Sequence, residues 1–282
     1  ASARSAHVAA LVMAAPADLI VTPETALREP LARLSGDTLS SLRAFSEQTG
    51  SDLFLGVAIQ TTGAGGTNSM LHLDPARRGG GFGRYDKMRL MPFGEYAPIG
   101  LAWFTDALPI PGKSLTAGAN DQAPFRLVKR GRGVAIGTLI CIEDMIGRDA
   151  VHWAPRVGLL LNPTDLSWFD DERAISQRLR IARLRALEVA RPLLRVANTG
   201  ITAQIGTRGE IVADVPTHRE AVLEGMVQPV QGLTPYARWG EMPVLACCAL
   251  GLGWLARSGL RRRRDSGAPR NRMGWPKRAP RR

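Results

Sequence analysis

Residues 133–144 have the sequence Gly-Val-Ala-Ile-Gly-Thr-Leu-Ile-Cys-Ile-Glu-Asp, in which an apolar run meets a group of reactive side chains. The apolar, β-branched part predicts a buried strand that ends at Cys141. Glu143 and Asp144 follow at once, and neighbouring negative charge disfavours a thiolate. A reactive cysteine in this setting therefore needs a cation and a general base close to it.

Two other segments offer those groups. Glu24 ends the strand-like segment 18–24, and Lys87 lies in the segment 85–90. Each of the three residues stands just past a strand pattern. A carboxylate, an ammonium and a thiol in this arrangement predict a nucleophilic site, with Glu24 as general base, Lys87 as oxyanion cation and Cys141 as nucleophile.

Composition limits the classes of protein to which the chain can belong. With 282 residues, 45% of them hydrophobic, it can bury one substantial core. Most of the formal net charge of +12 comes from residues 257–282, which contain eleven Lys or Arg and a single Asp. The rest of the chain is close to neutral, so we expect no nucleic-acid partner. Three cysteines, two of them adjacent, and four scattered histidines give no disulfide framework and no metal-ligand spacing, so we expect no metal and no cofactor.

Helical and strand patterns alternate along the chain. Helical patterns cover residues 5–15, 31–48 and 173–190, and strand patterns cover 18–24, 53–59, 68–73, 157–162, 193–197, 201–212 and 221–230. The strand pattern 201–212 contains a hairpin turn at Arg208 and Gly209. This alternation predicts an α/β fold with a largely buried sheet.

The helix predicted over residues 173–190 is amphipathic. Its apolar stripe consists of Ile175, Leu179, Ala182, Ala186 and Val189. Because its arginines lie mostly off this stripe, we expect a helix packed on a sheet with a solvated basic face.

The C-terminal part changes character. Residues 242–256 are apolar throughout, and Arg257 and a block of further arginines follow. We expect a transmembrane helix over residues 240–257 and a basic, disordered cytoplasmic tail over 258–282, because arginines beside an apolar helix favour the cytoplasmic side. The preceding domain, residues 1–235, would then be extracytoplasmic. The alternative is a buried core helix, because the apolar run is shorter than the about 20 residues that usually cross a bilayer.

Several short motifs occur in order over about residues 15–256. They are Pro23-Glu24-Thr25-Ala26, Asn68-Ser69, Tyr85-Asp86-Lys87, Pro92-Phe93-Gly94-Glu95-Tyr96, Cys141-Ile142-Glu143-Asp144, Asn198-Thr199-Gly200 and Gly232-Leu233-Thr234-Pro235-Tyr236. With these motifs the sequence resembles the carbon–nitrogen hydrolase (nitrilase) superfamily. The Pro-Phe-Gly-Glu-Tyr loop, the Thr-Pro-Tyr segment and the trailing apolar helix narrow the resemblance to the bacterial apolipoprotein N-acyltransferases.

The resemblance implies a nitrilase-like αββα sandwich and assigns roles by match. The catalytic residues it implies are Glu24, Lys87 and Cys141, and the supporting groups are Glu95, Glu143 and the backbone N–H of Ile142. It also implies a ping-pong reaction in which the thiolate takes an acyl chain from a phospholipid and forms a thioester. The acceptor would be the N-terminal amine of an S-diacylglyceryl-cysteine in a bacterial lipoprotein.

These substrates imply a membrane as partner, and the inner (cytoplasmic) membrane as location, with the catalytic domain on its extracytoplasmic side. The loop segment 101–104 is apolar, and we expect its aromatic residues Trp103 and Phe104 to bind the acyl substrate. The alternative for this segment is packing against the core, which is common for apolar clusters in loops.

Three departures from the family pattern bear on the function. Ile142 stands where the family has an aromatic residue after the cysteine, and Thr22 stands where a tryptophan often precedes the Pro-Glu pair. The N-terminal membrane helices and the first strand of the family's catalytic domain have no counterpart, so we expect a chain that begins inside the domain. Two alternatives stay open: an amidase or nitrilase of the same fold that hydrolyses a small C–N bond, and a non-catalytic, membrane-tethered binding domain.

Overall fold

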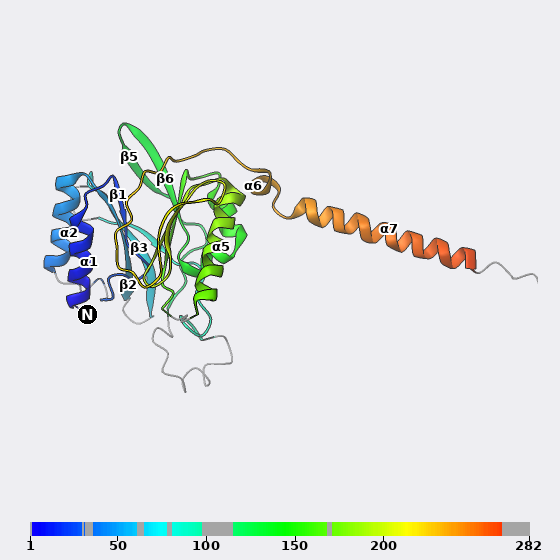
Figure 1. Cartoon of the computed structure of the whole chain (residues 1–282), viewed down its shortest axis with the longest axis horizontal. Coiled ribbons are helices and arrows are strands. Elements are labelled where there is room, and N and C mark those ends of the chain that lie inside the picture. Colours follow the sequence, from blue (N-terminus) through cyan, green and yellow to red (C-terminus); the bar gives the residue numbers. More distant parts are fainter. Residues whose placement is uncertain are drawn as a thin grey trace, which may run out of the picture. The chain divides into compact units, whose positions relative to one another are not determined.

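The computed structural model describes residues 2–29, 31, 36–60, 65–77, 81–97, 115–167 and 171–266. The chain divides into two compact units, Ala1–Arg238 and Trp239–Arg282. The first unit contains two β-sheets and the helices that cover them (Figure 1). The second unit contains one long helix.

The first sheet has four strands in the order β1-β2-β3-β4. They are β1 Leu19–Val21, β2 Asp52–Gln60, β3 Gly66–Leu73 and β4 Gly83–Asp86. β1 is parallel to β2, and the other neighbours are antiparallel. Helices α1 (Ser2–Ala14) and α2 (Gly36–Thr49) lie on the outer side of this sheet (Figure 1), and they bury an apolar cluster between them and β2 and β3.

The second sheet has six strands in the order β10-β9-β8-β7-β6-β5. They are β5 Phe125–Lys129, β6 Arg132–Thr138, β7 Leu159–Thr164, β8 Leu193–Ala197, β9 Thr202–Ile205 and β10 Ile211–Val215. The central strands β6, β7 and β8 are parallel, and the outer pairs are antiparallel. The 3-10 helix η2 (Cys141–Met145), helix α4 (Gly147–Trp153) and helix α5 (Glu172–Val189) connect these parallel strands.

The two sheets pack face to face. Phe54 of β2 meets Phe125 of β5 edge to face, with ring centroids 5.0 Å apart. α1 and α2 lie outside one sheet and α5 outside the other, so the layers follow the order helix, sheet, sheet, helix (Figure 1). The predicted α/β class and the implied nitrilase-like sandwich are confirmed at this level. The central strands of both sheets are buried because each sheet separates an inner apolar layer from a helical one, while the edge strands β5 and β10 expose part of their side chains.

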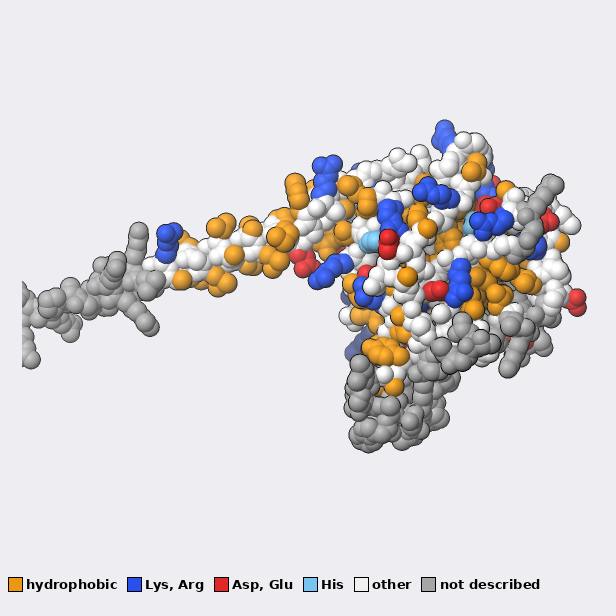
Figure 2. All heavy atoms as spheres, turned by 180° about the vertical axis from the view of Figure 1, so that it is seen from behind, with side chains coloured by type: hydrophobic (Ala, Val, Ile, Leu, Met, Phe, Trp, Pro, Cys, Tyr) orange, Lys and Arg blue, Asp and Glu red, His pale blue; other side chains and the backbone are white. Residues whose placement is uncertain are grey.

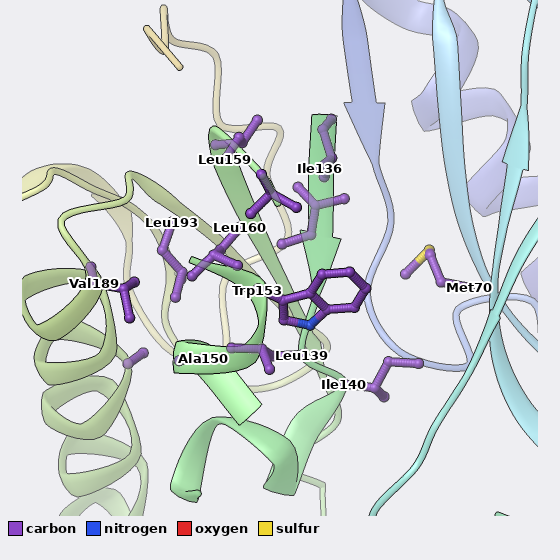
Figure 3. Packing of buried hydrophobic residues seen from close by; sticks show 14 of the residues in the cluster. Met70, Ile136, Leu139, Ile140, Ala150, Trp153, Leu159, Leu160, Val189 and Leu193 are labelled. Atoms are coloured by element: carbon purple, nitrogen blue, oxygen red, sulfur yellow. The ribbon is translucent and has the colours of Figure 1, made fainter. Parts of the chain in front are cut away.

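Trp153 occupies the centre of the main core. Figure 3 shows it among Ile136, Leu139 and Ile140, with Met70 of the first sheet on its other side. Its indole N–H donates to the carbonyl of Thr138 at 3.0 Å, which satisfies the polar group of a side chain that is only 1% exposed.

Three local features of the structure differ from what the sequence predicts. Residues 221–230 form no strand; their backbone runs without regular pairing, and one main-chain hydrogen bond joins Val230 to Gly158. No strand is predicted over residues 125–129, where the structure has β5, whose alternating burial is typical of a sheet edge. The strand of the opening segment stops at Thr138, and Cys141 begins η2 instead of ending the strand.

The stripe predicted for α5 is buried as expected, but the solvated basic face is only partly correct. Arg178 and Arg185 are buried, with 8% and 7% of their surface exposed. Each reaches an acidic partner: Arg178 pairs with Asp144 at 2.6 Å, and Arg185 pairs with Glu188 at 3.0 Å. Charge pairing inside the fold allows these arginines to face the core, and periodicity alone does not reveal it.

The second unit is dominated by helix α7, Met242–Ser266. Figure 2 shows hydrophobic side chains along the described part of this helix, and those of Leu250, Leu252 and Trp254 are 68–75% exposed. Within the described residues no helix is both long and apolar enough to cross a membrane, so the expected transmembrane helix over 240–257 is not found. The reason is length: the apolar run ends at Arg257, while the helix itself continues to Ser266.

Candidate active site

The three predicted catalytic residues come from different elements and meet at one end of the sandwich. Glu24 lies in the turn after β1, Lys87 directly follows β4, and Cys141 is the first residue of η2. The first sheet therefore provides the carboxylate and the ammonium, and the second sheet provides the thiol.

A close backbone crossing holds Glu24 in place. A Cβ atom added to Gly56 of β2 would lie 2.0 Å from the carbonyl oxygen of Pro23, so only glycine permits this approach. Thr22, which stands where the family often has a tryptophan, stabilises the same crossing. Its hydroxyl group accepts a hydrogen bond from the N–H of Gly56 at 2.9 Å and donates one to the carbonyl of Phe54. Thr22 therefore has a clear structural role.

Lys87 lies between two carboxylates. Its Nζ is 2.8 Å from Oε1 of Glu24 and 2.9 Å from Glu95, and the residue is 1% exposed. Burial by itself would lower the pKa of Lys87, but the negative charges of Glu24, of an ionised Cys141 and of Glu95 outweigh burial and raise it. The ammonium is therefore permanently charged, as a group that stabilises an oxyanion has to be.

Asn68 of β3 joins the same two carboxylates. Its side-chain Nδ2 donates to Oε1 of Glu24 at 2.7 Å and to Oε1 of Glu95 at 2.9 Å. Oε2 of Glu95 also accepts from the N–H of Met91 at 2.7 Å. Glu24, Glu95, Asn68 and Lys87 thus form one buried network, in which two negative charges face one positive charge.

The remaining oxygen of Glu24 points toward the strand that precedes α5. Oε2 accepts from the backbone N–H of Asp165 at 2.6 Å, and the carbonyl oxygen of Asp165 lies 4.0 Å from Sγ of Cys141. Asn198 adds a hydrogen bond from its side chain to the backbone oxygen of Glu24 at 2.8 Å. Asp165 and Asn198 therefore connect the base to the second sheet, which carries the thiol.

Cys141 is buried and strained. It is 7% exposed, and its φ of +49° lies in the left-handed region that non-glycine residues rarely adopt. Burial and the charge of Glu24 raise the pKa of the Cys141 thiol to about 12, while Lys87, a hydrogen bond with Thr164 and the charge of Arg178 act in the opposite direction. The resting thiol is protonated, so a base has to remove its proton when it attacks.

Glu143 connects two segments of the site. Its carboxylate is fully buried and accepts from Tyr85 Oη at 2.9 Å and from the backbone N–H groups of Ile140 at 2.6 Å and Met88 at 2.5 Å. A weaker bond comes from the N–H of Arg89 at 3.2 Å. The carboxylate thereby ties the loop after Lys87 to the turn that carries Cys141.

The pKa of Glu143 follows from this environment. Burial raises it to about 7, and the hydrogen bonds from Ile140, Met88, Tyr85 and Arg89 limit the rise. Burial and the nearby Glu143 raise the pKa of the Tyr85 hydroxyl well above its ordinary value, so it remains a hydrogen-bond donor.

The remaining site expectations have mixed outcomes. Ile142 is the second residue of η2, where the N–H groups of a helical first turn have no acceptor inside the helix. Trp103 and Phe104 lie outside the described residues. No group of three or more His, Cys, Asp or Glu side chains in the described part of the chain is arranged to hold a metal ion.

Sequence reasoning assigned no site role to Asn68, Tyr85, Asp165 or Asn198. Three of them stood inside motifs already noted, Asn68-Ser69, Tyr85-Asp86-Lys87 and Asn198-Thr199-Gly200, so the motifs marked the positions without the contacts. Asp165 acts through its backbone, for which a sequence carries no signal.

This fold and this site define a class of protein. Residues 2–233 match the family model of the carbon-nitrogen hydrolases, and the chain belongs to that family. Within the family it is similar to proteins named apolipoprotein N-acyltransferase. It is 37% identical to the one from Ralstonia nicotianae, over 92% of this chain and 48% of that protein, and 36% identical to the one from Methylococcus capsulatus, over 92% and 49%. The chain spans about half the length of these relatives.

Solved structures agree on the fold. The chain superposes on a carbon-nitrogen hydrolase from Helicobacter pylori with a TM-score of 0.57 and 15% identity, covering 77% of this chain and 82% of that one. An amidase from a Nesterenkonia species gives a TM-score of 0.54 and 18% identity, over 77% of this chain and 81% of that one. At these identities the likeness concerns the fold alone.

Proposed function

We propose that this chain is the catalytic unit of an apolipoprotein N-acyltransferase. The observation that carries the proposal is the position of Lys87, whose Nζ lies within 2.9 Å of both Glu24 and Glu95 and whose charge acts on Cys141. The similarity to relatives of that name supports the choice of acyl transfer over other chemistry of the family. A thiol and a base in this arrangement can form and resolve an acyl-enzyme.

In the first half-reaction, Glu24 takes the thiol proton and Sγ of Cys141 attacks the ester carbonyl carbon of a phospholipid. The ammonium of Lys87 and the backbone N–H of Ile142 stabilise the negative charge that develops on the carbonyl oxygen. The C–O ester bond then breaks, and the lysophospholipid leaves with the proton that Glu24 had accepted. The product is a thioester on Cys141.

In the second half-reaction, the α-amine of an S-diacylglyceryl-cysteine attacks the thioester carbonyl. Glu24 accepts the proton that the amine loses, an amide bond forms, and the C–S bond breaks to release the thiolate, which is reprotonated. Glu95 and Asn68 hold the side chains of Glu24 and Lys87 in position during both steps. Glu143 holds the two loops that carry Lys87 and Cys141.

Both substrates are anchored in lipid, so the proposed reaction takes place at a membrane surface. The partners are a phospholipid donor and a lipoprotein acceptor, and the proposed location is the extracytoplasmic face of the bacterial inner membrane. The exposed apolar side chains of α7 suit such an environment.

The test is a search for the acyl adduct. The full chain is incubated with phosphatidylethanolamine vesicles, and the peptide that contains Cys141 is analysed by mass spectrometry. We expect one acyl chain on Cys141, absent from a Cys141→Ala variant and discharged by a diacylglyceryl-cysteine peptide. A chain that forms no adduct with phospholipid but hydrolyses small amides would identify an amidase, and one that does neither would support a binding domain.

A further inference from the structure

A second buried charge cluster lies beside Cys141, whose carbonyl oxygen it contacts. It consists of Asp144 of η2, Arg178 of α5 and Arg195 of β8, and these residues are 0%, 8% and 1% exposed. Asp144 pairs with Arg178 at 2.6 Å and with Arg195 at 3.2 Å. Two guanidinium groups share one carboxylate, so the cluster has an excess positive charge.

Hydrogen bonds from Arg178 to the carbonyl of Cys141 and from Arg195 to Oδ1 of Asn162 satisfy only part of the two guanidinium groups. Nη1 of Arg178 and Nη2 of Arg195 are buried and have no acceptor among the residues that the structure describes. Burying charged groups is unfavourable unless they are paired, and well-packed apolar side chains would stabilise a core at least as well. Stability alone therefore does not explain why two arginines occupy this position.

Arg178 also contacts the nucleophile's own backbone. Its Nη2 donates to the carbonyl oxygen of Cys141 at 2.8 Å while it pairs with Asp144. The same guanidinium group thus binds both Cys141, the first residue of η2, and Asp144, three positions later. Because Cys141 has a strained φ of +49°, its turn needs such an external hold to keep its shape.

The cluster also acts on the thiol through its charge. The charged groups that act on Cys141 are Glu24 and Lys87, which follow strands of the first sheet, Arg178 of α5 and Arg195 of β8. The charge of Lys87 is already shared between Glu24 and Glu95, whereas the guanidinium pair has charge to spare. A thiolate that forms at Cys141 is therefore stabilised by Lys87 and by the guanidinium pair.

We propose that Arg178, anchored by Asp144, is a positioning residue for the nucleophile: it holds the strained turn of Cys141 and places positive charge behind the thiol. This inference rests on the proposed role of Cys141 and names a group that supports that cysteine in addition to Lys87. The proton balance of the reaction does not change, because Glu24 still accepts the thiol proton.

The experiment measures how fast iodoacetamide alkylates Cys141 in the full chain between pH 7 and 9. Peptide mapping separates Cys141 from Cys247 and Cys248, which are exposed and react independently. The variants are Arg178→Gln, which removes the charge, and Asp144→Asn, which removes the opposing charge and keeps an oxygen. Arg180→Gln is the matched control, because it removes an exposed arginine from the same helix.

The expected effects have opposite signs. Arg178→Gln slows alkylation at a given pH by about tenfold, the equivalent of one pKa unit, and Asp144→Asn accelerates it. Arg180→Gln leaves the rate unchanged. A purely structural role for the pair predicts slower or unselective reaction in both variants, without this opposition of sign.

Two results would overturn the inference: a folded Arg178→Gln variant with the wild-type profile, or a folded Asp144→Asn variant that reacts more slowly than wild type. If Arg178→Gln does not fold, the Asp144→Asn result decides the question. The proposed function fails separately, if wild-type Cys141 acquires no acyl chain from phospholipid vesicles.

Discussion

At the scale of single residues, Lys87 controls the charge balance of the site. Its ammonium is the positive member of a buried network that contains two carboxylates, and its side chain is 2% exposed. In the proposed reaction the cation stabilises the oxyanion, and in the fold it neutralises its two carboxylate neighbours. Its removal consequently affects folding as well as turnover.

We predict that Lys87→Met lowers the free energy of unfolding by about 3–5 kcal/mol, because it leaves buried carboxylates unpaired. Denaturant titration measures the loss, and the acyl adduct on Cys141 should disappear. The double variant Lys87→Met/Glu24→Gln is the control: it should recover part of the stability and none of the activity. A single variant as stable as wild type would contradict the charge balance described for the network.

Glu143 gives a pH prediction. Its pKa is raised from 4.5 in the unfolded chain to about 7 in the fold. A carboxyl group with a raised pKa binds its proton more tightly when folded, so its stabilising effect is complete below about pH 4.5 and is lost as the pH rises through about 7. The loss amounts to about 3 kcal/mol.

The measurement compares wild type with Glu143→Gln, which cannot titrate. The difference in unfolding free energy between the two, followed by denaturant titration from pH 4.5 to 8, should fall by that amount in favour of the variant. Titrations of other groups are common to both proteins and cancel. A difference that is constant with pH would show that Glu143 has an ordinary pKa.

At the scale of secondary structure, β6 is fitted to the helix that follows it. Gly137 allows Trp153 of α4 to lie against the strand, because a Cβ atom there would meet the indole at 2.7 Å. The indole therefore packs directly on the strand, which ends one residue later at Thr138. The chain then turns into η2, which begins with Cys141.

We predict that Gly137→Ala destabilises the fold by about 1–3 kcal/mol through overpacking. Gly133→Ala is the matched control on the same strand, because nothing lies within 4 Å of its added Cβ. Thermal unfolding followed by circular dichroism distinguishes the two. Equal melting temperatures for both variants would mean that Trp153 moves aside without difficulty.

At the scale of the whole molecule, the chain consists of a sandwich and a separate helical unit. The sandwich, Ala1–Arg238, is compact by itself and contains every described residue of the proposed site. The helical unit exposes a series of large apolar side chains, which in water favours association with other apolar material.

We predict that a chain ending at Arg238 keeps the melting temperature of the sandwich to within about 2 °C, since stability differences well below 1 kcal/mol move it by no more than that. Differential scanning calorimetry of both forms is the measurement. A large drop in melting temperature would mean that the helical unit contributes to the stability of the sandwich.

The local pattern determined the α/β class, most helices and strands, and the residue types of the site. Glu24 and Cys141 were identifiable because each follows an apolar run, and short-range periodicity places such residues at strand ends. Lys87 has no apolar run before it and was marked by the motif Tyr85-Asp86-Lys87. The stripe of α5 followed from its spacing for the same reason.

Tertiary structure alone decided how these groups act on one another. The bridge that Asn68 makes between Glu24 and Glu95, the burial of Arg178 against Asp144 and the irregular path of residues 221–230 depend on contacts between distant segments. Propensity and periodicity describe one segment at a time, whereas desolvation and charge pairing arise only where segments meet. The sequence therefore determined which reactive groups are present, and packing decided their charges and geometry.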